Sequence, residues 1–267
     1  MMVPVSLIAA VACLFAVLHA AAHVIVHRVL LHGQNWYRML PDGKKADYTL
    51  QIVWLLVGTP LPFAYAHTAL NLRDDVESRW HGASDVCMYA MLLHVGQSLY
   101  ESCLFFVHRK PLVYQLHHVI VVLSYGLALY CGRMHFWAAW AGLVESTNIN
   151  LCILQMMVIS GVGRGSLGET LNGACLWLLY LVFRVLMLPA WLIAFYSDAT
   201  ENYARSYGAF DDAAADVAMP HRLLHRIVPC SIVGLWLICL LWFDALTKGM
   251  LKALRGGEAG KGKSKEA

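Results

Sequence analysis

Charged side chains are scarce in this sequence. Only 14% of its 267 residues are Asp, Glu, Lys or Arg, while 59% are hydrophobic; a typical soluble domain has about 25% and 45–50% respectively. So few charges cannot cover the surface of a water-soluble fold of this length. A soluble enzyme, a nucleic-acid-binding protein and a disordered chain are therefore excluded, and a membrane protein is predicted.

The sequence also lacks paired cysteine motifs. Its eight cysteines lie in or beside apolar runs, and none has the CxxC or zinc-type spacing that would indicate a disulfide framework or a metal site. We expect them to be small apolar packing residues.

Long apolar runs are abundant. A helix needs about 20 largely apolar residues to cross the hydrocarbon, where its backbone must satisfy its own hydrogen bonds. Seven stretches qualify, which predicts an all-α membrane protein of about seven transmembrane helices: Val3–Val26, Tyr48–Leu70, Ala83–Val107, Leu112–Tyr130, Phe136–Ile159, Leu171–Phe195 and Ile227–Leu246. The second contains Gly58, Pro60 and Pro62, which should kink it. The third is the weakest, because it carries His94, Gln97 and Glu101.

The few basic residues fall unevenly between these spans. Thirteen lie in the first, third and fifth connections and the C-terminal tail, whereas six lie in the alternate connections. By the positive-inside rule, the C-terminus is expected in the cytosol and the N-terminus on the lumenal or external side. Lys263 and Lys265 form a terminal K-x-K-x-x pattern that resembles the dilysine retrieval signal of endoplasmic reticulum membrane proteins. A solubilising polar tail is the alternative.

The first apolar run has two interpretations. Ala20, Ala21 and Ala22 offer the small residues of a signal-peptide cleavage site. However, no basic residue precedes the run, and it is long for a signal peptide, so an uncleaved span is favoured.

Polar residues at membrane depth are costly and mark functional sites when they face the bundle interior. His117 and His118 are adjacent in the fourth span; they point about 100° apart, so at least one should face the interior. An imidazole can act as a general base or attack a thioester carbonyl. Glu145 and Asn148, which share a helix face, or Glu101 could orient these rings.

Arg184 is the one basic residue inside a predicted span. Two roles are open for it. It could bind an anionic head group, or it could pair with Glu145 or Glu101, which is the more frequent outcome for a charge at membrane depth.

The order of several segments resembles the TLC domain shared by ceramide synthases and the translocating-chain-associated membrane protein. These segments are His108-Arg-Lys-Pro111, Tyr114-Gln-Leu-His117-His118-Val, Leu123-Ser-Tyr125-Gly126, Leu143-Val-Glu145-Ser-Thr-Asn148 and Val182-Phe-Arg184-Val-Leu-Met-Leu-Pro189. The resemblance implies a TLC-type helical barrel in the endoplasmic reticulum membrane. It also implies a role in lipid metabolism, with sphingolipid-type N-acyl transfer from acyl-CoA to a sphingoid base as the expected chemistry.

The resemblance suggests a role for each candidate residue. His117 and His118 would serve as base or acyl acceptor, with Glu145 and Asn148 orienting them. Arg109 and Lys110, in the third connection, could meet the phosphates of acyl-CoA, although the positive-inside rule explains them equally well.

One departure favours a competing hypothesis. Ceramide synthases follow the double histidine with an H-D-x-x-D-x-x-L-E-x-x-K type signature, of which only Glu145 and Leu151 remain in kind. The positions of its His, second Asp, Glu and Lys are occupied by Val144, Asn148, Cys152 and Gln155. This places the chain in a divergent branch and favours a non-catalytic lipid sensor or regulator of membrane lipid composition.

The thirteen histidines raise a remote third hypothesis, a membrane di-iron hydroxylase or desaturase. His19, His23 and His27 repeat every four residues, as do His221 and His225, and such enzymes use H-x-x-x-H pairs as iron ligands. The charge distribution places His27 on the opposite side from the other pair, so they cannot share one site. The first-span histidines are better explained as a packing or interfacial face. No metal is predicted, and no cofactor beyond acyl-CoA as a co-substrate.

The expected organisation has three parts: an N-terminal helix and cytosolic loop at 1–44, a TLC domain at 45–246, and a basic cytosolic tail at 247–267. Expected partners are membrane lipids, acyl-CoA and a sphingoid base, with no nucleic acid. A homo-oligomer remains open.

Overall fold

Helices build the whole described fold. A computed structural model describes residues 3–161, 165–202 and 215–262. Its elements are α1 (Val5–Ile25), η1 (Val26–Leu30), α2 (Asn35–Arg38), α3 (Asp42–Gly58), α4 (Leu61–Leu72), α5 (Val76–His81), α6 (Asp85–Val107), α7 (Leu112–Cys131), α8 (His135–Gly142), η2 (Leu143–Thr147), α9 (Asn148–Ser160), α10 (Leu167–Tyr180), η3 (Leu181–Leu186), α11 (Met187–Glu201) and α13 (Ala215–Gly262).

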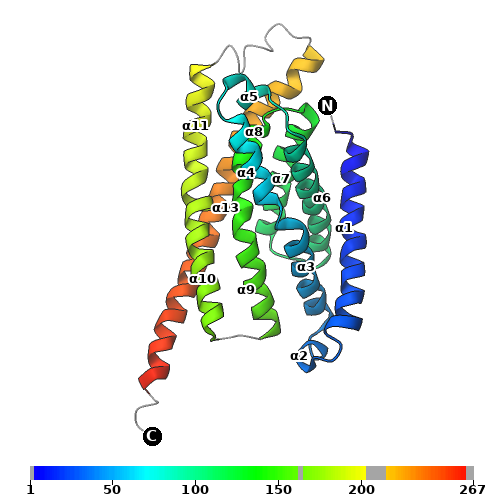
Figure 1. The fold of residues 1–267 in the computed structure, drawn as a ribbon, viewed down its shortest axis with the longest axis vertical. Helices are drawn as coiled ribbons and strands as arrows, with labels where there is room; N and C mark the ends of the chain where they lie inside the picture. Colours follow the sequence, from blue (N-terminus) through cyan, green and yellow to red (C-terminus); the bar gives the residue numbers. More distant parts are fainter. Residues whose placement is uncertain (1–2, 162–164, 203–214, 263–267) are drawn as a thin grey trace.

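Seven helical segments of the described chain are long and apolar enough to cross a membrane. They are Val5–Val29, Asp42–Leu72, Val76–Val107, Leu112–Cys131, His135–Ser160, Leu167–Glu201 and Arg222–Lys252. The predicted all-α membrane fold with seven spans is confirmed, although most spans are longer than the apolar runs alone indicated. N- and C-termini lie at opposite ends of the bundle (Figure 1), as an odd number of spans requires.

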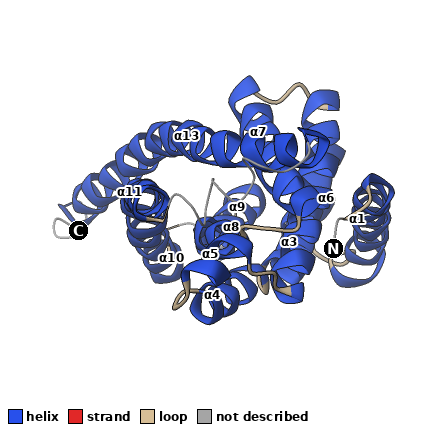
Figure 2. Ribbon diagram, turned by 90° about the horizontal axis from the view of Figure 1, so that it is seen from above, coloured by secondary structure: helices blue, strands red, loops and turns tan. Residues whose placement is uncertain are grey.

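Six of the spans form a closed ring. Around the ring, the order of neighbouring spans is second, third, fourth, seventh, sixth and fifth. The fifth span contacts the second and closes the ring. The first span lies outside this ring, where α1 packs on α6 and α3 (Figure 2). The upper half of the fifth span, α8, leans inward and also contacts α6, α7 and α11.

Histidines attach the first span to the ring. His19 is buried, and its two ring nitrogens lie 2.6 Å from the Tyr100 hydroxyl and 3.1 Å from the Ala46 carbonyl oxygen. His23 lies 3.4 Å from the hydroxyl of Thr49. His19 and His23 therefore serve to pack the first span against α6 and α3.

Prolines interrupt two spans. As predicted, the second span breaks near Pro60, where α3 ends at Gly58 and α4 begins at Leu61. In the sixth span, Pro189 has no N–H to give the carbonyl of Val185, four residues before it. The Trp236 indole of α13 donates to that carbonyl instead, at 3.0 Å. A helix irregularity at membrane depth is thus satisfied by a neighbouring span.

The end of the ring nearest the N-terminus is closed by α5 and an aromatic cluster. Trp80, Trp137, Trp191 and Phe195 are almost completely buried there, with ring centroids 4.8–5.5 Å apart. Asp198 of α11 accepts hydrogen bonds from Trp80 and from two nitrogens of the Arg79 guanidinium, at 2.6–3.1 Å. In the described part of the chain, these side chains fill the ring interior at this end.

Two expectations concern the C-terminal region. The helix α13 continues without a break to Gly262, so the tail predicted to start at residue 247 begins inside a helix. The dilysine pattern at Lys263 and Lys265 lies outside the described residues.

Candidate functional site

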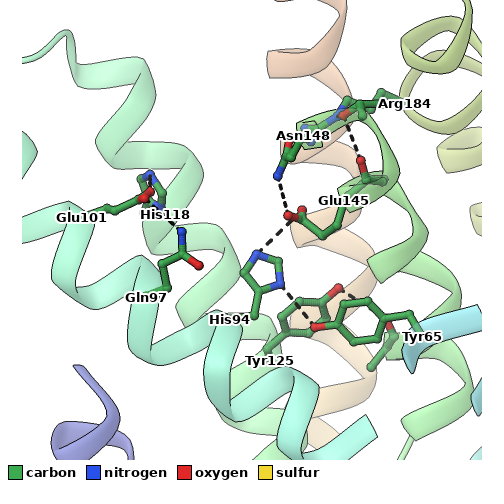
Figure 3. Close-up of polar contacts among 12 residues, drawn as sticks. Tyr65, His94, Gln97, Glu101, His118, Tyr125, Glu145, Asn148 and Arg184 are labelled. Carbon is green, nitrogen blue, oxygen red and sulfur yellow. Dashed lines mark hydrogen bonds and ion pairs between the residues drawn. The ribbon is translucent and has the colours of Figure 1, made fainter. Parts of the chain in front are cut away.

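Two buried polar clusters occupy the ring interior. The Glu145 cluster consists of Tyr65, His94, Glu145, Asn148 and Arg184, and the Glu101 cluster consists of Gln97, Glu101 and His118 (Figure 3). They share the helix α6, on which positions 94, 97 and 101 fall on one face. Glu101 follows His94 by seven positions, which places these two residues about 10 Å apart along the helix axis.

Glu145 is the centre of the first cluster. Its side chain is 3% exposed, and both carboxylate oxygens are in use. One lies 3.7 Å from Nε2 of His94, and the other accepts a hydrogen bond of 2.5 Å from the Asn148 amide. The Nδ1 atom of His94 lies 3.3 Å from the Tyr65 hydroxyl. The imidazole is therefore held from both sides.

Arg184 completes this cluster from the sixth span. Its guanidinium donates to Oδ1 of Asn148 at 2.9 Å and to the Thr147 hydroxyl at 2.8 Å. It also lies over the Tyr180 ring, 5.3 Å from the centroid. Among the described residues, Arg184 forms no direct ion pair with Glu145 or Glu101 and reaches Glu145 only through the side chain of Asn148. Both predicted roles of Arg184 therefore stay predictions.

The Glu101 cluster is arranged around a second buried carboxylate. The Gln97 amide donates to one oxygen at 3.0 Å, and Nε2 of His118 lies 3.4 Å from the other. Two polar atoms next to these contacts, Oε1 of Gln97 and Nδ1 of His118, are buried and have no hydrogen-bond partner in the described structure.

His117 belongs to neither cluster but lines a pocket between α6, α7, α8, η2 and α13. His94 and Glu145 line the same pocket, together with Ser124, Tyr125, Ser231 and mostly apolar side chains. The empty space of the pocket is about 570 Å³, including the part open to the surroundings. The inner cavity that water can occupy has a volume of about 30 Å³. That inner volume holds about two waters, so a larger ligand must displace side chains.

The structure separates two of the predicted partners. We expected Glu145 and Asn148 to orient His117 and His118, with Glu101 as an alternative. Instead, Glu145 contacts His94, and His118 contacts Glu101. Hairpin geometry explains the second pair: Glu101 lies six residues before the end of α6, and His118 six residues after the start of α7. Residues placed symmetrically about a short link lie at the same depth.

His94 is one of the polar candidates that the sequence shows at membrane depth in the third span, but no role in the site was predicted for it. The signal that could have found it is its spacing of i, i+3 and i+7 with Gln97 and Glu101, which indicates one interior face.

The connection between α6 and α7, which contains Arg109 and Lys110, lies at the opposite end of the ring from the aromatic cluster. Arg109 is exposed and has a positive φ of 51°, in the left-handed region. Lys110 forms an ion pair with Asp47, in which its Nζ lies 3.4 Å from a carboxylate oxygen. Among the described residues, no group of three or more His, Cys, Asp or Glu side chains could hold a metal ion.

A comparison with protein families matches the part of the chain that contains both clusters and the pocket. The family model of the TLC domain matches residues 44–248, from the start of α3 into α13. This range includes every residue of both clusters and of the pocket lining, and it excludes α1. No curated protein matches the chain.

Proposed function

Because this chain belongs to the TLC domain family, a family with a lipid-related role in membranes, we propose that it transfers the acyl chain of an acyl-CoA to the amine of a sphingoid base. The observation that carries the proposal is the ring pocket, where His94, His117 and Glu145 face a mostly apolar space. Apolar walls with a few convergent polar groups are typical of sites for lipid-like ligands.

The proposed reaction needs one proton acceptor beside the reacting atoms. The amine nitrogen attacks the thioester carbonyl, the carbon–sulfur bond breaks and the amide bond forms, so that the products are an N-acyl lipid and CoA with a free thiol. His117 would take the proton from the amine and return it to the leaving thiolate. Its Nδ1 is buried and has no partner among the described atoms, so it is not committed to another contact.

His94 would be a positioning residue. Its two nitrogens face Glu145 and Tyr65, which leaves no ring nitrogen for the substrate. Glu145, Asn148 and Arg184 would fix this ring and set the charge of the pocket wall.

Cell location and sidedness are part of the proposal. The excess of basic residues at one end supports a cytosolic C-terminus, and the dilysine pattern supports the endoplasmic reticulum. Cytosolic acyl-CoA would then approach the end that carries Arg109. The aromatic cluster, whose side chains are buried at the other end of the described ring, supports the same direction of entry.

A second candidate function is a lipid sensor without turnover. The observation that favours it is the role of Asn148, which stands where the ceramide synthase signature has an acid and here bridges Glu145 to Arg184. Such a bridge stabilises the fold whether or not the pocket turns over substrate.

An acyl-transfer assay tests the choice. Microsomes containing the chain would be supplied with labelled acyl-CoA and sphinganine. Microsomes from cells with the empty vector would receive the same substrates and give the background. Labelled N-acyl product that falls at least 100-fold in His117→Ala, and less in His118→Ala, supports the enzyme with His117 as its base. No product above the background rejects it and leaves the sensor.

A further inference from the structure

One face of α7 lines the ring pocket over about three turns. The lining residues of this helix share the spacing of a single face: His117, Ile120, Val121, Ser124, Tyr125 and Ala128. His117 is the one nearest the connection to α6, and Ala128 is the one nearest the aromatic cluster. A chain whose reacting carbonyl lies at His117 therefore extends along this face toward the aromatic cluster.

Ser124 of α7 and Ser231 of α13 lie at the same depth in this pocket. A Cβ added to Gly234 of α13 would lie 3.2 Å from the side chain of Ile120 of α7, which gives the register of the two helices. The fourth and seventh spans cross the bundle in opposite directions. Three positions before Gly234 therefore correspond to three or four positions after Ile120, where Ser124 lies.

Two members of the Glu145 cluster reach the pocket at this depth as well. The His94 ring lies 5.1 Å from the ring of Tyr125, the residue that follows Ser124, and Glu145 contacts His94. The polar belt of the pocket is defined by four lining residues at this depth: His94, Ser124, Glu145 and Ser231.

Ser231 supplies a free hydroxyl to the polar belt. The nitrogens of His94 and the oxygens of Glu145 are already engaged. Ser124 donates to the Ile120 carbonyl, as Ser hydroxyls in helices often do, and keeps its oxygen as an acceptor. The Ser231 side chain is only 8% exposed, and its hydroxyl has no hydrogen-bond partner in the part of the chain that the structure describes. A buried hydroxyl is costly unless a ligand or a water bonds to it.

We infer that the polar belt selects acyl chains that carry a hydroxyl group near their middle. An alkyl hydroxyl has one donor and two lone pairs, so it can donate to Ser124 and accept from Ser231 at the same time. The inference deepens the proposed function by naming the class of acyl chain, and it rests on that function for the position of the carbonyl at His117.

The distance between His117 and the belt gives the position of the hydroxyl. Ser124 follows His117 by seven positions, which is about 10 Å along α7. An extended polypeptide advances about 3.3–3.6 Å per residue of three bonds, so an extended chain advances about 1.2 Å per bond and reaches the belt at about its tenth carbon. Beyond the belt the lining is apolar, with Ala128, Met134 and Ala138.

Other chain substituents match the belt less well. A chain without a polar substituent leaves the Ser231 hydroxyl without a partner and displaces the water that the inner cavity can hold. A keto group can accept from Ser231 but cannot donate to Ser124. A carboxylate would lie beside Glu145 and be repelled by its charge.

Binding of uncharged esters to the full chain in detergent tests the belt without any turnover. Methyl 10-hydroxyhexadecanoate would be compared with methyl hexadecanoate, which has no hydroxyl, and with methyl 2-hydroxyhexadecanoate, whose hydroxyl lies next to the carbonyl. We expect the first ester to bind at least about 5-fold more tightly than either of the others. Equal binding of all three overturns the inference and leaves water as the partner of Ser231. Equal binding of the two hydroxy esters overturns it too, because the belt would then not sense the position of the hydroxyl.

Variants locate the preference at the belt. Ser231→Ala should lower the affinity for methyl 10-hydroxyhexadecanoate to that for methyl hexadecanoate, without weakening the binding of the latter. The matched control is Ser102→Ala, because Ser102 donates to the Ser98 carbonyl of α6 and does not line the pocket; this variant should keep the full preference. A preference that persists in Ser231→Ala overturns the inference.

The same variants separate this inference from the proposed function. A preference for the 10-hydroxy ester that depends on Ser231, in a chain that transfers no acyl group, supports the belt and rejects the enzyme. Acyl transfer at equal rates from 10-hydroxyhexadecanoyl-CoA and hexadecanoyl-CoA, unchanged in Ser231→Ala, supports the enzyme and rejects the belt.

Discussion

Arg184 is a buried cation linked to the buried carboxylate of Glu145 through the side chain of Asn148. Arg184→Met keeps an unbranched, flexible side chain and removes the guanidinium with its charge and its donors. The guanidinium reaches the carboxylate through the Asn148 amide, by contacts of 2.9 and 2.5 Å. The two charges are thus at most about 8 Å apart, where their attraction at an effective dielectric constant near 20 is about 2 kcal/mol.

Arg184→Met should lower the free energy of unfolding by about 3–5 kcal/mol, because it leaves a buried carboxylate without its cation. Adding Glu145→Gln to Arg184→Met removes that carboxylate charge. The double variant should therefore be more stable than Arg184→Met alone, with a coupling energy of about 2 kcal/mol in a double-mutant cycle. Unfolding of the full chain in detergent micelles measures all four members of the cycle.

An additive cycle would refute this reasoning. A coupling energy below about 0.5 kcal/mol is within the range of independent sites, and it would mean that Arg184 does not compensate Glu145. Glu77→Gln, an exposed substitution of the same type, controls for the general effect of removing a carboxylate.

Two further predictions concern the packing that holds these clusters. Gly142→Ala should cost about 1–3 kcal/mol of stability, because the added Cβ would overlap the Tyr65 ring that contacts His94. The matched control is Gly126→Ala, in which the added Cβ meets no neighbouring atom. Equal melting temperatures of the two variants would contradict the close approach of α4 and α8. Trp236→Phe should cost about 1–3 kcal/mol by leaving the Val185 carbonyl without its donor, and Pro189→Ala should recover part of this loss by restoring a backbone N–H. A double variant that melts below Trp236→Phe would contradict that explanation.

The number of spans and their polar contents could be predicted from the sequence. Apolar length alone identifies the seven helices, and the cost of burying polar groups singles out His117, His118, Glu145 and Arg184. The pair Glu145 and Asn148 follows from its i, i+3 spacing, and the structure joins the two side chains by a hydrogen bond. Each of these properties depends on one helix at a time.

The partners across helices could not be predicted in the same way. The order of spans around the ring is not their order along the chain, since the seventh stands between the fourth and the sixth. A helix pattern tells which side faces inward but not which neighbour it meets. For this reason the sequence pattern favours Glu145 as the partner of His118, whereas His118 contacts Glu101 on the helix that immediately precedes it.

Departures from regular α-helix explain why the Glu145 cluster lies where it does. Glu145 and Thr147 belong to the 3₁₀ segment η2, in which residues three apart eclipse one another. This geometry stacks Asn148 directly on Glu145, closer than the roughly 60° offset of an α-helix allows. Arg184 lies in the π-helical segment η3, which is followed by Pro189.

Both irregular turns face the ring interior, where side chains can satisfy the backbone groups that such turns free. The hydroxyl of Thr147 bonds to the Val144 carbonyl, and the indole of Trp236 bonds to the Val185 carbonyl. The polar residues and the backbone irregularities therefore occur together: the 3₁₀ segment η2 carries Glu145 next to Asn148, and the π-helical segment η3 carries Arg184, whose guanidinium donates to Asn148.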